Sequence, residues 1–343
     1  MFRSMDYYID LGTANTLIYA RKIGFLLNEP TVLALKHRSF HKKENFALGK
    51  QAKAMLGKNP EQLSVLRPLR EGVISDIENT TRLLHGFVKL IKINLPWSKP
   101  RMILSLPCVV SEFEKRAVEE VGYDLGARRV HLLDEPLAAA IGAGLPVLGS
   151  RGQMIVDIGG GTTEIVVVSL GGIVASQAVR IGGDTIDAGI IECLRSQYGF
   201  LIGEQTAERL KIHVSNALLI NSSSTQKRMT VGGFNVTTGL PGKLTVTPNM
   251  IFPALNGVIC EIISAIRKIF DQCPPEISGD VADNGIVLAG GGALIGNLKR
   301  RLAQDLGVPV RIAETPLMSV ALGGAQVLEN SKLLDIVERK TAS

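Results

Sequence analysis

The amino-acid sequence predicts a layered α/β protein built from two similar halves that face each other across a cleft. Three observations lead to this prediction: a repeated glycine hairpin, a repeated run of helix, strand, turn and helix, and the length of 343 residues. That length is sufficient for about two domains of ~150 residues, each with its own hydrophobic core. A cleft between two such halves is a common place for a ligand to bind.

The first repeat joins two short segments that each continue an apolar strand. Residues 9–16 (IDLGTANT) and 156–163 (VDIGGGTT) both read apolar, Asp, apolar, Gly, three small or polar residues and Thr. Each segment is followed by a strand-forming run, at 17–19 and at 165–168. The pattern predicts strand, tight glycine turn and strand in both halves.

The second repeat lies further along each half, with a slip of one residue between the copies. An amphipathic helix precedes it, over 111–125 with a Ser111/Glu114 capping box and over 297–306 with Gly307 at its end. Strands followed by alternating helices and strands predict a layered α/β domain in each half. The paired landmarks are 124–126 with 305–307, Glu135 with Glu314, Pro136 with Pro316, Leu137 with Leu317, and Gly142 with Gly323.

The two glycine hairpins are suited to hold a polyphosphate from opposite sides. Glycine lets backbone N–H groups approach phosphate oxygens, and successive N–H groups form an anion-binding concavity. Asp10 and Asp157 precede the two turns, where carboxylate oxygens could hold a hydrated Mg²⁺. Either hairpin alone would also fit an ordinary β-turn, so the prediction depends on their pairing. Side-chain donors are available from Thr13, Asn15, Thr162 and Thr163.

A third glycine segment completes the predicted nucleotide site. Residues 285–294 (GIVLAGGGAL) read as an apolar strand that ends in three glycines before a helix. A strand-to-helix turn of bare backbone suits the approach of a flat nucleoside. The segment lacks the Gly-Lys-Ser/Thr ending of a P-loop, which argues for a different class of nucleotide-binding fold.

The order of these segments resembles that of actins, DnaK-type chaperones and sugar kinases. The motifs at 10–16, 135–144, 157–164 and 180–184 are most similar to those of the MreB family, the filament-forming bacterial actin relatives, and the similarity extends over essentially the whole chain. The resemblance implies an actin-like (ribonuclease H-like) duplicated α/β fold, with two large β/α subdomains and two small insertion subdomains around a nucleotide cleft. The implied boundaries are 1–31, 65–150 and 318–343 for subdomain IA, 32–64 for IB, 151–180 and 246–317 for IIA, and 181–245 for IIB.

The resemblance also implies roles for individual residues, with ATP or ADP and Mg²⁺ as ligands. Glu135 would accept a hydrogen bond from the water that attacks the γ-phosphate, with Thr162 and Asp157 as further catalytic residues. A helix N-terminal acid that interacts with the helix dipole would also explain Glu135. Asp10 and Asp157 would hold the metal, largely through water. The implied nucleotide-binding residues are Gly12, Thr13, Ala14, Asn15, Gly159, Gly160, Gly161, Thr162, Thr163, Gly182, Gly183, Asp184, Glu208, Lys211, Gly290, Gly291, Gly292 and Leu294.

Glu208 and Lys211 match ribose-contacting positions of the relatives, although their spacing of three residues would also suit a plain ion pair on a helix surface. Both interpretations stay open from the sequence.

Composition and charge limit the class of protein further. Hydrophobic residues make up 45% of the chain, but charged residues interrupt the apolar runs before the ~18 to 20 residues of a membrane span. No secretory signal precedes the first strand, which predicts a cytoplasmic protein. Four cysteines lack the close pairing of a zinc or redox motif. The net charge of +6 would suit an anionic membrane surface, a nucleotide or nucleic acid, and does not choose among them.

A loop at 92–101 is a candidate for membrane attachment. Pro96 and Pro100 argue against helix or strand, and the only tryptophan, Trp97, lies beside Leu95. Basic residues on both sides would suit anionic lipid headgroups, and the relatives are similar in using a hydrophobic loop of the same domain. The alternative is that Trp97 folds back onto the core.

The leading functional hypothesis is an ATP-dependent, filament-forming cytoskeletal ATPase. The resemblance implies that its partners are further copies of itself, the inner face of the cytoplasmic membrane, and membrane-bound cell-shape and wall-synthesis proteins, with no nucleic acid. It would be cytoplasmic and peripherally associated with the membrane. The alternatives are a small-molecule kinase or a chaperone-type ATPase of the same fold. A chaperone would need a peptide-binding domain after the nucleotide domain. A kinase stays open because the sequence does not show whether water or a substrate hydroxyl receives the phosphate.

Overall fold

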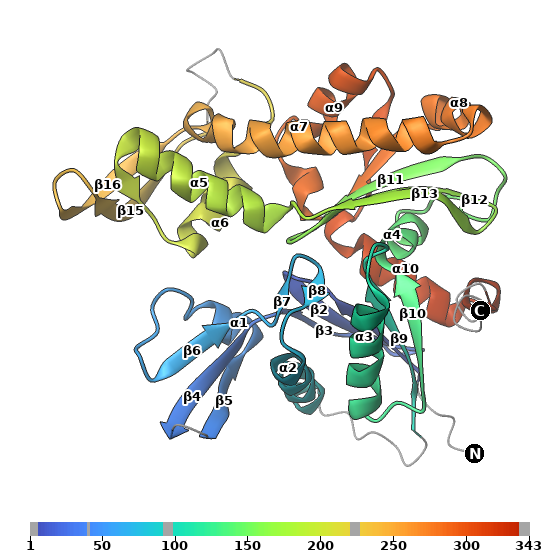
Figure 1. Cartoon of the computed structure of the whole chain (residues 1–343), viewed down its shortest axis with the longest axis horizontal. Helices are drawn as coiled ribbons and strands as arrows, with labels where there is room; N and C mark the ends of the chain where they lie inside the picture. The colour runs from blue at the N-terminus through green and yellow to red at the C-terminus, as the bar shows by residue number, and fades with distance from the viewer. Residues whose placement is uncertain (1–5, 40–41, 92–98, 220–226, 336–343) are drawn as a thin grey trace.

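Two five-stranded sheets form the centres of two halves that lie one above the other in Figure 1. The computed structural model describes residues 6–39, 42–91, 99–219 and 227–335. In the first sheet the strand order is β10-β9-β1-β2-β3, and in the second it is β18-β17-β11-β12-β13. The strands of the first sheet are β1 (Tyr7–Leu11), β2 (Asn15–Ala20), β3 (Gly24–Pro30), β9 (Arg101–Leu106) and β10 (Arg129–Asp134). Those of the second are β11 (Gln153–Ile158), β12 (Thr163–Ser169), β13 (Gly172–Val179), β17 (Ile286–Ala289) and β18 (Val310–Ile312).

The two sheets have the same topology, so the predicted duplication is confirmed. In each, the first three strands pair antiparallel and the last two add in parallel beside the first strand. Every residue of β11 and β12 is buried, in keeping with their mainly apolar and β-branched sequence. The predicted actin-like α/β fold class is therefore the one observed.

Helices cover the outer faces of both sheets. In the first half these are α2 (Ile77–Leu90) and α3 (Glu112–Asp124), and α3 begins with the predicted capping box. The Ser111 hydroxyl accepts from the Glu114 amide at 3.2 Å, and the Glu114 carboxylate accepts from the Ser111 amide at 2.6 Å. In the second half they are α5 (Gly183–Tyr198), α7 (Pro248–Gln272), α8 (Pro275–Asn284) and α9 (Leu298–Leu306).

The helix α7 corrects the expectation that no apolar segment reaches the length of a membrane span. Within the described residues it is the single helix long and apolar enough for one. Its buried residues Ile251, Leu255 and Ile259 recur every four positions and belong to the core of the second half, against β12, β13 and α5. Its position is that of a helix packed on the protein's own sheet.

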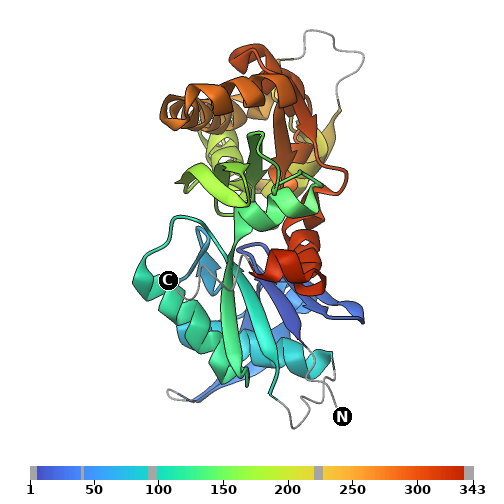
Figure 2. The same ribbon diagram turned by 90° about the vertical axis from the view of Figure 1, so that its right-hand side faces the viewer.

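Two equivalent helices, α4 (Glu135–Gly142) and α10 (Ser319–Glu329), cross between the halves and lie side by side in Figure 2. They meet at the paired glycines of the sequence repeat. A Cβ on Gly142 would overlap the carbonyl oxygen of Ser319, and one on Gly323 would overlap the carbonyl oxygen of Ala138. Because any Cβ at either position would overlap the backbone of the other helix, only glycine permits this crossing.

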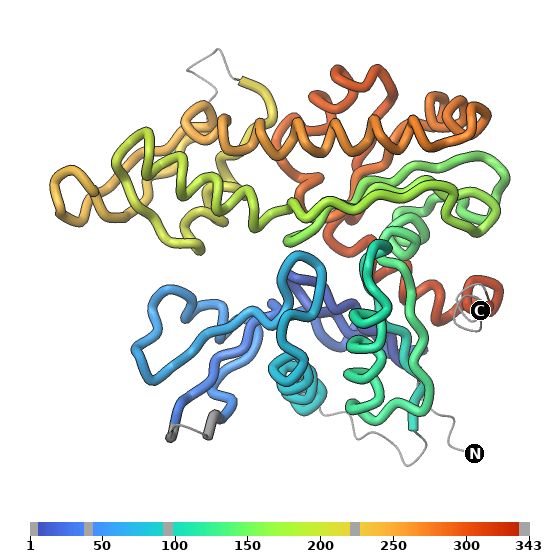
Figure 3. The backbone as a smooth tube through the Cα atoms, in the orientation of Figure 1, coloured from blue at the N-terminus to red at the C-terminus, as the bar shows by residue number. Residues whose placement is uncertain are grey.

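Each half also carries a small three-stranded sheet at the same end of the molecule, on the left of Figure 3. The first half has β5-β4-β6 with helix α1, and the second has β14-β15-β16 with helix α6. The bounds are β4 (Leu33–Ser39), β5 (Lys42–Leu48), α1 (Gly49–Lys53), β6 (Leu63–Leu66), β14 (Phe200–Leu201), α6 (Glu204–Val214), β15 (Met229–Asn235) and β16 (Leu240–Val246). Shorter elements are β7 (Leu69–Arg70), β8 (Val73–Ile74), η2 (Gly291–Leu294) and η3 (Pro316–Met318).

Candidate nucleotide-binding site

A cleft of about 360 Å³ lies between the halves, with the β1–β2 and β11–β12 hairpins facing each other across it. It brings together most residues predicted from the sequence. The predicted residues that line it are Asp10, Gly12, Thr13, Ala14, Asn15, Glu135, Asp157, Gly159, Gly160, Gly161, Thr162, Gly183, Asp184, Glu208, Lys211, Gly290, Gly291, Gly292 and Leu294.

Two predicted nucleotide-binding residues lie outside this lining. Thr163 is fully buried, and its hydroxyl donates to the carbonyl of Ile181 at 2.8 Å, so it fastens β12 to the segment before α5 instead of facing a ligand. Gly182 lies behind the second hairpin, where a Cβ would come within 2.6 Å of the Gly160 carbonyl oxygen. Leu95 and Trp97, the predicted membrane contacts, lie outside the described residues.

The hairpins are held in shape by hydrogen bonds that the motifs alone do not reveal. In the first hairpin the buried Thr31 donates from its hydroxyl to the Gly12 carbonyl at 2.7 Å and from its amide to the Ala14 carbonyl at 3.0 Å. In the second, the Gly159 amide donates to the Thr162 carbonyl at 2.8 Å. Thr31 was missed by the sequence analysis because it lies well beyond the glycine turn and belongs to no recognisable motif.

The two hairpins approach each other where the second hairpin has only glycine backbone. A Cβ on Gly160 would lie 2.9 Å from the Cβ of Ala14, and one on Gly161 would lie 2.9 Å from the Thr13 hydroxyl oxygen. Backbone amides from both halves can therefore reach a single small anion between the turns.

Asp10 and Asp157 lie side by side in this cleft as buried carboxylates. Burial raises the pKa of Asp10 to about 6, against an opposing hydrogen bond from the Ser105 hydroxyl at 3.1 Å. Burial, and then the charge of Asp10, raise the pKa of Asp157 to about 7. Neither carboxylate forms an ion pair within the described part of the chain. Among the described residues, no pairing cation therefore compensates the charge of either carboxylate.

The same donor set fits Mg²⁺. This ion prefers oxygen ligands, keeps several waters, and is commonly bound by one or two carboxylates together with substrate phosphates. In the described ranges no group of three or more His, Cys, Asp or Glu residues is placed to hold a metal ion. The pair is therefore suited to a hydrated ion shared with a phosphate and not to an ion enclosed by protein ligands alone.

Glu135 is the first residue of α4 and lines the cleft with a half-buried side chain. Burial raises its pKa well above the usual range, and the charges of Glu164, Asp10 and Asp157 add to this effect. Its carboxylate accepts no hydrogen bond from any described residue, so it is available to a water or ligand. Its place at the helix N-terminus is also favourable for an acid, so both interpretations from the sequence fit the structure.

A further buried acid, Glu164, was not singled out from the sequence. It pairs across the sheet with Asp157. Its Oε1 accepts from the Cys108 amide at 2.8 Å, whereas Oε2 is buried and has no hydrogen-bond partner among the described residues. Burial is the largest cause that raises the pKa of Glu164, to about 8. The signal in the sequence is a charged residue beside the apolar run 165–168, which predicts a buried strand.

The glycines after β17 serve the packing of the protein as well as the cleft. A Cβ on Gly290 would overlap the Ile158 carbonyl oxygen, and one on Gly292 would overlap the Ile158 side chain. A Cβ on Gly291 would meet only Leu317, at 3.4 Å. Of the three, Gly291 is thus the one not required by close packing inside the protein.

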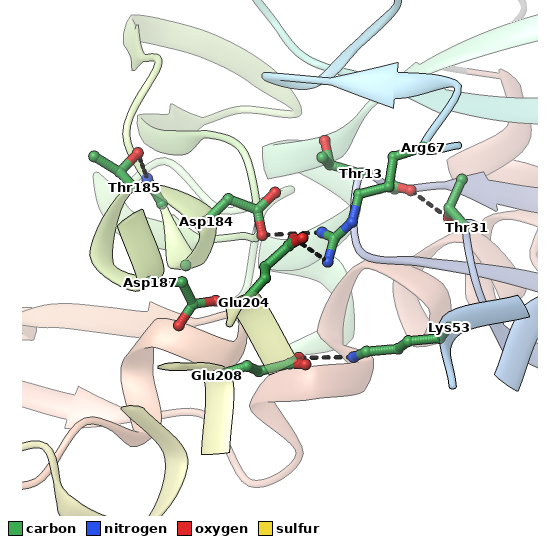
Figure 4. A network of polar contacts seen from close by, with 12 residues as sticks. Thr13, Thr31, Lys53, Arg67, Asp184, Thr185, Asp187, Glu204 and Glu208 are labelled. Atoms are coloured by element: carbon green, nitrogen blue, oxygen red, sulfur yellow. Dashed lines mark hydrogen bonds and ion pairs between the residues drawn. The ribbon is translucent and has the colours of Figure 1, made fainter. Parts of the chain in front are cut away.

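Ion pairs join the halves beside the cleft, as Figure 4 shows. Lys53 of α1 bonds Glu208 of α6 at 2.7 Å. Arg67 reaches Asp184 at 3.3 Å and Glu204 at 2.7 Å. Lys53 and Arg67 were not identified from the sequence, since each lies more than a hundred positions from its partner.

The spacing of Lys211 and Glu208 would allow an ion pair between them, but these two residues do not pair in the structure. The Lys211 ammonium group donates instead to Asp187 at 2.7 Å and to the Gly183 carbonyl at 2.9 Å. Burial raises the pKa of Asp187 to about 6, while the charge of Lys211 opposes the shift. Lys211 therefore ties α6 to the start of α5 at the edge of the cleft.

Two duplicated halves that enclose facing glycine hairpins define an actin-like protein. Comparison with known proteins is consistent with this class: the family described as MreB/Mbl protein matches residues 4–336. The chain belongs to the MreB/Mbl family.

Similar proteins match along nearly their whole length. The cell shape-determining protein MreB of Escherichia coli (strain K12) is 45% identical over 333 residues, which cover 96% of this chain and 95% of the relative. The crystal structure of MreB 5 of Spiroplasma citri bound to AMPPNP has a TM-score of 0.91 at 30% identity, covering 99% and 100% of the two chains. The ADP-bound structure of that protein has a TM-score of 0.89 at 31% identity, covering 97% and 98%.

Proposed function

We propose that this protein binds and hydrolyses ATP in the cleft, and that ATP binding favours its assembly into cytoskeletal filaments. The observation that carries the proposal is the close approach of the two glycine hairpins, with two buried carboxylates and Glu135 beside them. The relatives whose structures contain AMPPNP or ADP share this fold along their whole length. Their nucleotides support ATP and ADP as the ligands here.

In the proposed reaction the hairpin amides bind the phosphates, and Glu135 accepts a hydrogen bond from a water molecule. The water oxygen forms a bond to the γ-phosphorus while the bond from that phosphorus to the bridging oxygen of ADP breaks. The proton of the water passes to Glu135, and the products are ADP and orthophosphate. Asp10 and Asp157 would hold Mg²⁺ through water. The ion would neutralise charge on the phosphate oxygens.

Glu135 must be ionised to accept a proton, although burial and then the neighbouring carboxylates raise its pKa. A positive charge near a carboxylate lowers its pKa. The acids whose charges disfavour an ionised Glu135 are thus the ones that would suit a bound cation.

The test of this reaction separates binding from chemistry. Glu135→Ala should bind ATP nearly as well as the unaltered protein, because Glu135 does not hold the nucleotide, and should hydrolyse it ~10²-fold more slowly. Nucleotide affinity and ATP turnover would be measured on the same preparations. A variant that loses binding together with turnover would show that Glu135 has a structural role.

The assembly role is proposed from the family, whose curated relatives include a protein named for cell shape. Filaments of this chain would act in cell shape and wall synthesis at the inner face of the cytoplasmic membrane. Leu95 and Trp97 are the proposed membrane contacts. We also propose that the chain divides into the four subdomains with the boundaries given above. Electron microscopy with ATP, with and without anionic liposomes, tests this role. ATP-dependent filaments without an added substrate would favour it over a small-molecule kinase or a chaperone-type ATPase.

A further inference from the structure

One buried threonine, Thr31, holds the glycine turn between β1 and β2. Its hydroxyl donates to the Gly12 carbonyl at 2.7 Å, and its amide donates to the Ala14 carbonyl at 3.0 Å. Thr31 is fully buried and does not line the cleft. Any effect that it has on a ligand must therefore pass through the hairpin.

A second buried hydroxyl supports this contact. Thr16 is fully buried, and its hydroxyl oxygen lies 2.9 Å from that of Thr31. A threonine hydroxyl has one proton to donate. Since Thr31 donates its proton to the Gly12 carbonyl, Thr16 must be the donor to Thr31. The result is a chain of hydrogen bonds from Thr16 through Thr31 to Gly12, and the bonds of such a chain strengthen one another.

The direction of the Gly12 carbonyl decides where the next amide points. The peptide unit between Gly12 and Thr13 is trans and planar, so its C=O and N–H groups point in opposite directions. Because the carbonyl points to the buried Thr31, the Thr13 N–H points away from Thr31. This amide donates to no described residue, and both Gly12 and Thr13 line the cleft. The Thr13 amide is thus available to an anion in the cleft.

The second hairpin is held at the equivalent carbonyl, but by a backbone amide. Gly159 corresponds to Gly12 in the sequence repeat, and its carbonyl accepts from the Gly183 amide at 2.9 Å. Each half therefore holds its glycine turn from the segment that follows its third strand, β3 or β13. In the first half the hold on this carbonyl depends on a side chain, so a substitution can remove it there.

Without the Thr31 hydroxyl, the peptide unit after Gly12 would lose its fixed direction. Glycine has the widest range of backbone angles, so a peptide unit beside it rotates readily unless it is held. A carbonyl that has lost its hydrogen bond away from water is unfavourable. The unit would therefore rotate its carbonyl towards water in the cleft, and the same rotation would turn the Thr13 amide away from the cleft.

We infer that Thr31 is a positioning residue for phosphate binding: its hydroxyl sets the direction in which the Thr13 amide meets a polyphosphate. This inference rests on the proposed nucleotide binding in the cleft. Thr31 itself contacts no nucleotide, so it acts through the first hairpin. Its hydroxyl should therefore affect the affinity for the phosphates of a nucleotide and leave the affinity for the nucleoside unchanged.

The first experiment separates the phosphates from the nucleoside. Thr31→Val keeps the shape of the side chain and removes the hydroxyl, whereas Thr31→Ser keeps the hydroxyl. The affinities for ATP and for adenosine are measured by displacement of a fluorescent ATP analogue. Thr31→Val should bind ATP about three- to tenfold more weakly, the range expected for one lost hydrogen bond, and should bind adenosine as before. Thr31→Ser should bind both as the unaltered protein does.

Thr80→Val is the matched control. Thr80 in α2 is fully buried and its hydroxyl also donates to a carbonyl, that of Asp76 at 2.7 Å, but it does not line the cleft. It should lose about as much stability in urea as Thr31→Val and keep the affinity for ATP. Thr16→Val leaves the bond to Gly12 in place, so it should weaken ATP binding less than Thr31→Val. Equal weakening of ATP and adenosine in Thr31→Val would show a purely structural role and overturn the inference.

Amide hydrogen exchange tests the hold on the hairpin without a nucleotide. Exchange over residues 9–17 should be severalfold faster in Thr31→Val and normal in Thr31→Ser, and exchange over 156–163 should change much less, because backbone amides hold that hairpin. If the unaltered protein binds no ATP but the exchange changes in this way, the proposed nucleotide binding is refuted and the hold of Thr31 is supported. Unchanged ATP affinity in Thr31→Val, in a protein that binds ATP, would overturn the positioning role. So would unchanged exchange over 9–17 in Thr31→Val.

Discussion

Replacing Asp157 by Asn should stabilise the nucleotide-free protein at alkaline pH, although it removes a residue proposed for metal binding. The carboxylate is 8% exposed and has a pKa of about 7, against 3.8 for an ordinary aspartate. At 1.36 kcal/mol for each pKa unit, the ionised form costs about 4 kcal/mol in the fold. Because structural relaxation and water entry reduce such penalties, we treat this as an upper bound and expect a gain of about 2 kcal/mol.

The sign of the effect gives it a characteristic pH dependence. A carboxylate whose folded pKa is raised favours the fold below its unfolded pKa, and this advantage is lost as pH rises through the folded value. The stability gained by Asp157→Asn should therefore be small near pH 4, grow towards pH 7, and be complete at pH 8. Urea unfolding at these three pH values, with free metal chelated, measures it.

Two comparisons make the test specific. Asp271→Asn removes an exposed carboxylate from the surface of α7 and should change stability little at any pH. Addition of MgATP should stabilise the unaltered protein more than Asp157→Asn, since the variant lacks one proposed metal contact. If the variant is no more stable than the unaltered protein at pH 8, the reasoning from a buried, uncompensated charge is wrong.

Three further perturbations test other parts of the structure. Glu208→Lys should weaken nucleotide affinity in calorimetric titrations, because it breaks the ion pair with Lys53. If this pair only closes the cleft, adding Lys53→Glu should restore the affinity, whereas failure to restore it would favour a ribose contact by Glu208. Gly142→Ala should cost about 1 to 3 kcal/mol in urea unfolding because its Cβ meets the backbone of α10, whereas Gly257→Ala on the open surface of α7 should be stabilising by up to ~1 kcal/mol. Leu95→Ser with Trp97→Ser should abolish co-sedimentation with anionic liposomes while ATPase activity is kept, and Trp97 fluorescence that is already blue-shifted and quencher-protected without lipid would contradict the membrane loop.

The sequence predicted best those structural features that depend on a few neighbouring residues. The two glycine hairpins, the capping box of α3 and the paired glycines Gly142 and Gly323 all follow from short patterns, and the duplication made them visible without relatives. Contacts between distant segments could not be read in this way. Thr31, Ser105 and Arg67 become part of the site only because the sheets and inserted segments bring them there.

Individual motif residues can also be required for reasons other than a ligand. Thr163 belongs to the second hairpin motif, yet its hydroxyl bonds the backbone before α5. Gly290 and Gly292 fit a nucleoside loop, yet each is already required by packing against Ile158. A motif therefore locates a site more reliably than it assigns each of its residues, because the same few positions must also join the site to the fold.

The duplication explains why two carboxylates face each other in the cleft. Asp10 in β1 and Asp157 in β11 occupy equivalent positions, so facing copies of one hairpin necessarily bring two carboxylates together. The halves then differ in their neighbours. Leu17 pairs across the sheet with Asp10, whereas Glu164 pairs with Asp157.

The connecting helices differ in the same way. Glu135 begins α4 and faces the cleft, whereas its counterpart Glu314 is exposed and does not line it. Residues that both halves share would hold the symmetric part of the ligand, the phosphates and their metal ion. Glu135, which only one half presents to the cleft, would be available to distinguish the γ-phosphate from the others. The chemistry of a duplicated site must come from such differences, because symmetric groups alone cannot select one end of a polyphosphate.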